Sequence, residues 1–466
     1  MRYKHLLYLL VATSLALSSF IVDQQFTASK KAKPNFVFIL ADDCTVWDLG
    51  TYGSADAITP HINQLASEGM KFNRAYQAAP MCSPTRHNLY TGLYPVKTGA
   101  YPNHTFARAG TQSIVHHLKP LGYRVAQSGK RHISPEEVFP FEYLGNKNNP
   151  DFTLIDGFLK EAKTTDQPFA LMLCSNEPHT PWDKGDASRF DPDRITLPPH
   201  YVDTPETREA FAHYLAEINY LDGQVGQTME LLKKHGFDKN TLVIFASEQG
   251  NSFPFAKWTL YEAGVRSGLI AWMPGTIKAG RESEAIVEYT DILPTFIDMA
   301  GGTSHKNLDG KSLWPILKEI KDKVKDYSYS LNTTRGVNHG SDYYGSRAIV
   351  NEGYRYILNL TPEVEFLNTV NNNPNAPQWY HSWEEKAQTD PRAQMLVQRY
   401  KNRPGEELYN IKDDSWNQHN LAEDEAYSAI KAHLHRELLR WMEECGDKGQ
   451  ETELAAFEYQ ARNRKK

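Results

Sequence analysis

The sequence Asn35-Phe36-Val37-Phe38-Ile39-Leu40-Ala41 is followed directly by Asp42 and Asp43. A continuous apolar run of this length predicts a strand that is buried on both faces of a parallel sheet. Two adjacent carboxylates at the end of such a strand are costly to bury without a partner, so we expect either a turn or a cation site. Carboxylate oxygens are hard ligands of the kind that Ca²⁺ and Mg²⁺ bind.

Three further apolar runs have the same form, at residues 122–127, 168–174 and 241–246. Each of them is followed by side chains that carry charge or can bind a ligand. In chain order these side chains are Lys130, His132, His179, Glu248, Gln249 and Lys257. Because ligands bind at the carboxyl edge of a parallel sheet, we expect them to share one crevice with the two aspartates.

The spacing of apolar residues also predicts helices between these strands. Residues 205–236 repeat apolar side chains at intervals of three and four, and Thr59-Pro60 opens a shorter helix that ends at Gly69. The fold class that follows is α/β, with a large, mixed and mostly parallel sheet between layers of helices. We expect this catalytic domain to span residues 33–325 and a smaller α+β subdomain to span residues 326–466.

Charge and cysteine content exclude several classes of protein. The 466 residues carry a formal net charge of -6, which offers no general basic field for nucleic acid. The four cysteines are too few and too scattered for a disulfide framework. We expect Cys44 and Cys174, which lie beside apolar runs, to pack as small hydrophobic side chains.

The N-terminus has the layout of a secretory signal peptide. Arg2, Lys4 and His5 precede an apolar run over residues 6–22, and we place the signal peptide at residues 1–28. A periplasmic or secreted protein without stable membrane insertion is therefore expected. An uncleaved membrane anchor is the alternative.

A second stretch, Met81-Cys82-Ser83-Pro84-Thr85-Arg86, has the character of a reactive site. Ser83 and Pro84 are typical of a helix cap and first turn, which would place Cys82 just outside a helix N-terminus. Arg86 would then lie one turn into the helix. An anion near Cys82 would meet both the helix end and a guanidinium suited to oxyanions.

The string Cys-x-Pro-x-Arg followed by Thr91-Gly92 resembles the signature of the type I sulfatases, which belong to the alkaline-phosphatase-like superfamily. The resemblance extends over about residues 34–422. It implies that Cys82 is converted by a sulfatase-maturating enzyme to formylglycine (3-oxoalanine), whose hydrate supplies the nucleophilic oxygen. It implies a sulfuric ester hydrolase that acts on a sulfated carbohydrate.

The resemblance also implies roles for individual residues. One Ca²⁺ would be bound by Asp42, Asp43, Glu248, Gln249 and an oxygen of modified Cys82. The family usually carries Asp and then Asn or His at the last two strand-end positions, so both side chains here are one methylene longer. Sulfate would be held by Arg86, Lys130 and Lys257, while His179 protonates the leaving group and His132 acts on formylglycine.

Two other readings of the residues stay open. A phosphatase of the same superfamily would use Thr or Ser as nucleophile and usually two metals, whereas ligands for one metal are visible here. A non-catalytic protein that binds sulfated glycans would keep the pocket but leave Cys82 as a thiol. Residues 248–258 resemble the branch of the family that holds sulfamidase-like and algal-polysaccharide sulfatases. We expect an algal glycan such as ulvan as substrate, with a glycosaminoglycan sulfatase or sulfamidase as the alternative.

Overall fold

The computed structural model describes residues 32–303 and 306–459, and Pro34–Lys466 forms one unit. Its larger sheet has eight strands in the order β4-β3-β5-β1-β6-β7-β2-β8. Within the described residues β7 alone runs against the others. The strands are β1 (Asn35–Asp42), β2 (Met70–Tyr76), β3 (Arg124–Gly129), β4 (Glu142–Leu144), β5 (Phe169–Cys174), β6 (Thr241–Glu248), β7 (Arg266–Trp272) and β8 (Arg281–Glu288).

The apolar run at residues 35–41 forms β1, and all eight residues of this strand are buried. Because successive side chains of a strand point to opposite faces, β1 contributes to two separate cores. Phe36, Phe38 and Leu40 belong to one core, whereas Val37 and Ile39 belong to the other. This explains why the run is apolar at every position, as expected of an interior strand with helices on both sides.

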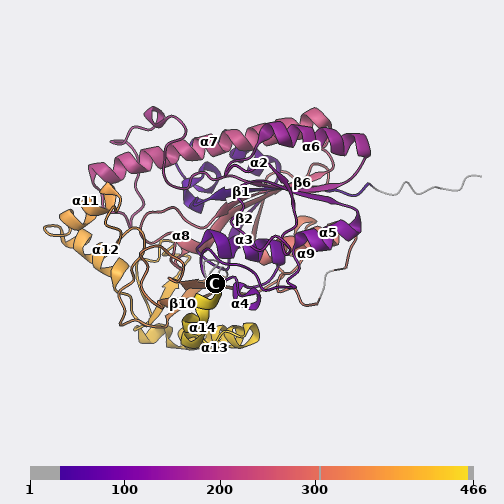
Figure 1. The fold of residues 1–466 in the computed structure, drawn as a ribbon. Coiled ribbons are helices and arrows are strands. Elements are labelled where there is room, and N and C mark those ends of the chain that lie inside the picture. The colour runs from indigo at the N-terminus through magenta and orange to yellow at the C-terminus, as the bar shows by residue number, and fades with distance from the viewer. Residues whose placement is uncertain (1–31, 304–305, 460–466) are drawn as a thin grey trace, which may run out of the picture. The chain divides into compact units, whose positions relative to one another are not determined.

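Helices cover both faces of the sheet (Figure 1). The core on one face contains side chains of α2 (Pro60–Glu68), α6 (Phe152–Thr165) and α7 (Pro205–His235). The core on the other face contains side chains of α3 (Cys82–Thr91), α5 (Ile114–Leu118) and α9 (Ile292–Met299), and α10 (Trp314–Leu317) joins it. The predicted α/β class with a mostly parallel sheet is confirmed.

Helices α2 and α7 begin and end close to their predicted limits. Thr59 caps α2 with Pro60 in the first turn, and Gly69 follows its last residue. The side chain of Thr204 accepts from the backbone N–H of Thr207 at the start of α7, and Gly236 ends that helix in the left-handed conformation. Thr59-Pro60 and Gly69 are the predicted limits of α2, whereas the prediction of α7 rested on apolar periodicity.

The helix of the Cys82 stretch begins two residues earlier than predicted. Met81 is the cap of α3, so Cys82 is the first helical residue and does not lie outside the helix. The hydroxyl of Ser83 does not cap the helix, because it accepts a hydrogen bond from the distant backbone N–H of Thr105 at 3.4 Å. A tertiary contact has replaced the local cap that the sequence predicted.

A second sheet follows the first in the chain. It has four antiparallel strands in the order β12-β11-β10-β9, formed by β9 (Ser328–Thr333), β10 (Gly345–Val350), β11 (Tyr354–Asn359) and β12 (Glu406–Asn410). Helix α13 (Ser428–Cys445) packs on it, with Trp441 stacked on Tyr329 at 5.0 Å between ring centroids. The remaining helices are α4 (Pro95–Thr98), α8 (Glu262–Val265), α11 (Gln378–Lys386), α12 (Pro391–Lys401) and α14 (Gln450–Ala455).

The segment between the sheets ends in a buried ion pair. Lys325 donates to Glu288 at 2.5 Å and to Asp291 at 2.7 Å, and Ser328 at the start of β9 donates to Glu288 at 2.8 Å. The backbone N–H of Leu331 in β9 also donates to the carbonyl of Ala78. The segment between the sheets is therefore anchored, and the two sheets are joined by specific contacts.

The four cysteines are all buried free thiols, as expected for Cys44 and Cys174. The predicted signal peptide lies outside the described residues. Within the described ranges, the structure contains no helix with the length and apolarity needed to cross a membrane.

Candidate active site

The ends of neighbouring strands bring the predicted site residues together. In the parallel register of β1 and β6, Asp42 lies opposite Glu248. Strand β5 lies between β1 and β3 in the sheet. In the pairing of β3 with β5, Gly129 lies opposite Cys174. A side chain at Gly129 would meet the carbonyl oxygen of Cys174 at 1.9 Å, so glycine is required where the chain turns toward Lys130.

Three of the site residues have left-handed backbone conformations. Their φ angles are 61° at Asp43, 42° at Gln249 and 48° at His132. Such conformations are unfavourable for residues other than glycine and are maintained only when the surrounding structure enforces them. Each one redirects the chain next to a strand end, which turns its side chain toward the shared crevice.

Helix α3 carries Cys82 into this crevice. All ten residues of α3 are buried, and Thr85 donates its hydroxyl proton to the carbonyl of Ala79 at 2.7 Å. The Sγ of Cys82 lies 3.0 Å from Nε2 of Gln249 and 4.0 Å from Nζ of Lys130. Burial, followed by the charge of Asp42, raises the pKa of the Cys82 thiol to about 12, so the unmodified thiol is protonated at neutral pH.

Three cations pair with three carboxylates in the crevice. Arg86 donates to Glu248 at 2.5 Å and Lys257 donates to Asp43 at 2.5 Å, while Lys130 donates to Asp42. The formal charges of these six groups cancel. The guanidinium of Arg86 also donates to the carbonyl of Lys130 at 2.8 Å, which fixes its orientation.

The cations govern the ionisation of Asp42. Burial alone would raise the pKa of this carboxyl, but Lys130, His179, Arg86 and Lys257 together hold the pKa well below its usual range. Burial would lower the pKa of Lys130, but Asp42 raises it above its usual value. Both groups are therefore charged at neutral pH.

The oxygens of the crevice meet the requirements of a divalent cation. Oδ1 of Asp42, Oε1 of Glu248 and Oε1 of Gln249 are buried and accept no hydrogen bond from any described residue. Ligand atoms of Asp42, Cys82 and His179 also lie within 4.8 Å of one another. Three hard oxygens without donors fit Ca²⁺.

His179 approaches the crevice from the segment after β5. Its Nδ1 lies 2.7 Å from the carbonyl of Thr180, so Nδ1 carries a proton and Nε2 faces Asp43 at 3.5 Å. Burial, followed by the charge of Lys257, lowers the pKa of His179. Trp182 fixes the same segment by donating its indole N–H to the carbonyl of Pro178 at 2.9 Å.

His132 lies at the margin of the crevice beside a histidine that the sequence did not indicate. Its Nε2 is 2.9 Å from Nδ1 of His104. Burial, followed by the charge of Lys130, holds the pKa of His132 well below its usual range, so the imidazole is neutral at neutral pH. His104 was missed because it follows neither a predicted strand nor the Cys82 motif.

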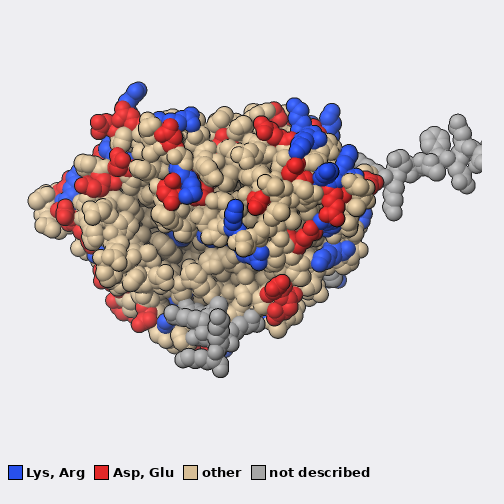
Figure 2. Space-filling view, turned by 45° about the horizontal axis from the view of Figure 1, so that its top comes forward, with Lys and Arg blue, Asp and Glu red and all other residues tan. Residues whose placement is uncertain are grey.

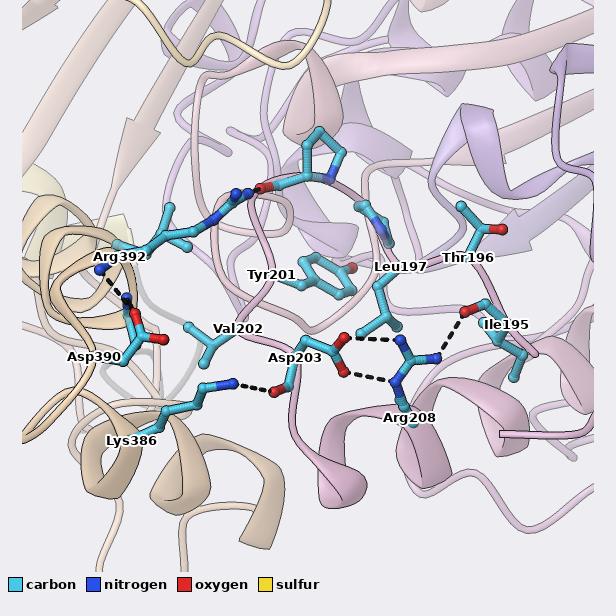
Figure 3. A pocket seen from close by; sticks show the side chains of 14 residues that line it. Ile195, Thr196, Leu197, Tyr201, Val202, Asp203, Arg208, Lys386, Asp390 and Arg392 are labelled. Carbon is cyan, nitrogen blue, oxygen red and sulfur yellow. Dashed lines mark hydrogen bonds and ion pairs between the residues drawn. The ribbon is translucent and has the colours of Figure 1, made fainter. Parts of the chain in front are cut away.

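A separate crevice contains none of the predicted site residues (Figure 3). Its cations are paired within the crevice. Arg208 donates to Asp203 at 2.6 and 2.8 Å, Lys386 donates to the carbonyl of Asp203 at 2.8 Å, and Arg392 donates to the carbonyl of Pro199 at 2.6 Å. These contacts connect the segment before α7 to α11 and α12, which indicates a structural joint.

Comparison with known proteins assigns the class. The family model described as Sulfatase matches residues 34–302, and the model described as N-sulphoglucosamine sulphohydrolase, C-terminal, matches residues 250–376. An ulvan-active sulfatase from Formosa agariphila is 32% identical over 428 residues, which cover 89% of this chain and 81% of the relative. N-sulphoglucosamine sulphohydrolase from Homo sapiens is 25% identical over 487 residues, covering 90% and 91%.

A solved structure shares the fold. The complex of BT4656 with its substrate D-glucosamine-2-N,6-O-disulfate aligns with a TM-score of 0.67 and 18% identity, over 90% of this chain and 99% of that chain. Fold, motif and sequence similarity agree on an alkaline-phosphatase-like hydrolase. The chain belongs to the sulfatase family, and it is a sulfuric ester hydrolase.

Proposed function

We propose that this protein removes sulfate esters from a sulfated polysaccharide or its oligosaccharides, with formylglycine derived from Cys82 as the nucleophile. The observation that carries the proposal is the position of Cys82 at the start of α3. Its side chain points into a buried cluster with Lys130 and Gln249 within 4.0 Å. A nucleophile formed there would be surrounded by groups that bind an oxyanion.

One Ca²⁺ is proposed to bind Asp42, Asp43, Glu248, Gln249 and an oxygen of modified Cys82. The donor-free buried oxygens of three of these residues support the assignment. A bound cation supplies Lewis-acid stabilisation of negative charge on sulfate oxygens. With Asp42 and Asp43 bound to that ion, the ammonium groups of Lys130 and Lys257, which now pair with these carboxylates, would be free to bind the substrate.

The remaining residues bind sulfate and handle protons. Arg86, Lys130 and Lys257 present three positive charges to the sulfate oxygens, which stabilises charge as the ester bond breaks. His179 holds Nδ1–H against a carbonyl, so Nε2 is the atom that would give a proton to the departing alcohol once the ring is doubly protonated. His132, held neutral by burial and by Lys130, would accept a proton from the formylglycine hydroxyl.

An algal glycan such as ulvan is the favoured substrate. The ulvan-active relative is 32% identical over 89% of this chain. A glycosaminoglycan sulfatase or sulfamidase is the second candidate, because the C-terminal family model over residues 250–376 is that of N-sulphoglucosamine sulphohydrolase. A sulfatase-maturating enzyme as partner and a periplasmic or secreted location complete the proposal.

A desulfation screen tests the substrate. Purified protein, matured in a host with a sulfatase-maturating enzyme, is incubated with ulvan, carrageenan and heparan oligosaccharides, and released sulfate is measured. We expect release from ulvan oligosaccharides first. Intact mass of the peptide that contains Cys82 is measured in parallel, since a thiol in that peptide together with glycan binding and no release would indicate a non-catalytic binder.

A further inference from the structure

A second cavity lies beside the candidate active site. It has a volume of about 400 Å³, within the range of small-ligand sites. Its walls are His104 and the segment 334–342, which follows β9 in the second sheet. Arg335, His339 and Asp342 make this lining polar. We call this cavity the flanking subsite.

The flanking subsite is contiguous with the catalytic crevice. Nδ1 of His104 lies 2.9 Å from Nε2 of His132, so the two imidazoles lie side by side where the flanking subsite meets the catalytic crevice. Thr105 donates its backbone N–H to the hydroxyl of Ser83, the residue after Cys82. His104, which lines the flanking subsite, and the adjacent Thr105 thus contact His132 and the residue after Cys82.

The walls of the subsite are held in position. The backbone N–H of Asn103 donates to the carbonyl of Arg335 at 3.2 Å, and a side chain at Gly336 would meet the carbonyl oxygen of Asn103 at 2.2 Å. His104 and His339 have φ angles of 53° and 58°, in the left-handed region that non-glycine residues avoid. Conformations of this kind concentrate at ligand sites.

Arg335 supplies a positive charge with a fixed orientation. Its guanidinium lies 4.3 Å from the ring centroid of Tyr343 and 5.6 Å from that of Phe457. Its ion pair with Asp342 is 3.5 Å long, and that carboxylate is 84% exposed. An exposed pair of this length contributes little, and Nε of Arg335 is buried and donates to no described residue.

We infer that the flanking subsite binds the sugar next to the sulfated one, and that Arg335 recognises an anionic group on that neighbouring sugar. A carboxylate and a second sulfate ester both match the guanidinium. His339 supplies a ring nitrogen for a sugar hydroxyl. The inference rests on the proposed carbohydrate substrate and adds the determinant of specificity.

Matched substrates test this assignment. Three disaccharides carry the same sulfate ester, and their second sugar is neutral, a uronic acid or sulfated. We measure kcat/KM on each for the wild-type protein and for Arg335→Gln, Arg335→Lys and Arg436→Gln. Arg436 is an exposed arginine on α13 and serves as the control for an identical change elsewhere.

We expect the wild-type protein to prefer one of the two acidic neighbours over the neutral one by about tenfold or more, and the preferred acid identifies the anion. Arg335→Gln is expected to bring this ratio to within about twofold of one, Arg335→Lys to keep part of it, and Arg436→Gln to keep all of it.

Equal kcat/KM on the three disaccharides in the wild-type protein would overturn this inference alone. An equal loss of kcat/KM on all three disaccharides in Arg335→Gln would also overturn the inference, because a loss that does not depend on the second sugar indicates a structural effect of the substitution. Absence of desulfation by the wild-type protein would overturn the proposed function together with the inference.

Discussion

Asp42 and Glu248 lie opposite each other where β1 and β6 end, and each carries a buried oxygen that accepts no hydrogen bond from the described residues. The guanidinium of Arg86 lies 2.5 Å from Glu248 and 3.7 Å from Asp42 and offsets their charge. Two buried carboxylates at the ends of neighbouring strands repel each other unless cations lie close to them. The same pairing that builds the sheet therefore creates the candidate metal site.

Replacement of Cys82 tests the nucleophile. Cys82→Ala removes the atom that becomes formylglycine, so we expect sulfatase activity to fall below detection. The free energy of unfolding should change by only about 1 kcal/mol, since a single buried sulfur is lost. Turnover of a nitrophenyl sulfate and thermal unfolding measure the two effects.

Cys445→Ala is the matched control, because Cys445 is a buried free thiol on α13. It should keep wild-type turnover. Wild-type rates in Cys82→Ala would identify another nucleophile. Cys82→Ser should also be inactive in a host that does not oxidise serine in this motif.

Removal of divalent cations tests the metal assignment. We expect exhaustive chelation to abolish turnover and to lower the melting temperature, and added Ca²⁺ to restore both. A ligand that binds only the folded state stabilises it by about 2.7 kcal/mol at a hundredfold excess over its dissociation constant. Glu248→Gln should weaken the Ca²⁺-dependent rise in melting temperature, whereas a full rise in this variant would contradict the assignment.

Leaving-group dependence separates His179 from His132. If Nε2 of His179 delivers the proton, His179→Ala should slow a sugar sulfate at least tenfold more than a nitrophenyl sulfate, whose phenolate departs unaided. His132→Ala should slow both substrates alike. His213→Ala, at an exposed position on α7, is the control. Equal losses on both substrates in His179→Ala would exclude the acid role.

Glu217 predicts a pH dependence of stability. Burial, followed by the charge of Glu177, raises the pKa of Glu217 from 4.5 to about 8. The unfolded chain releases this proton near pH 4.5, whereas the folded protein keeps it until about pH 8. The folded state thus binds more protons between these values, so the free energy of unfolding falls as the pH rises through that window.

Glu217→Gln should flatten this dependence. Glutamine keeps an oxygen to accept the backbone N–H groups of Asp183 and Lys184, which Glu217 now binds at 2.7 and 3.0 Å. Melting temperatures from pH 4.5 to pH 8 measure the slope. Glu230→Gln, at an exposed position on the same helix, should keep the wild-type slope.

The site was predictable to the extent that its residues follow apolar strands or belong to a contiguous motif. Asp42, Lys130, His179 and Glu248 each come after a buried run, and the ends of parallel strands meet at one edge. His104 was not predictable in this way, because it follows no apolar run and contacts a residue 28 positions further along the chain. The first residue of α3 was not predictable either. The hydroxyl of Ser83, which was expected to cap this helix, accepts a hydrogen bond from the backbone N–H of Thr105.

The amino-acid sequence by itself determined the class of the fold and the chemistry of the centre. Apolar periodicity is a local property that specifies which segments are buried, and the Cys82 motif is contiguous. Only the tertiary structure decided which oxygens lack donors, which cation pairs with which carboxylate, and that segment 334–342 borders the site. Those features depend on distances between residues far apart in the chain, and such distances are set by packing of the complete fold.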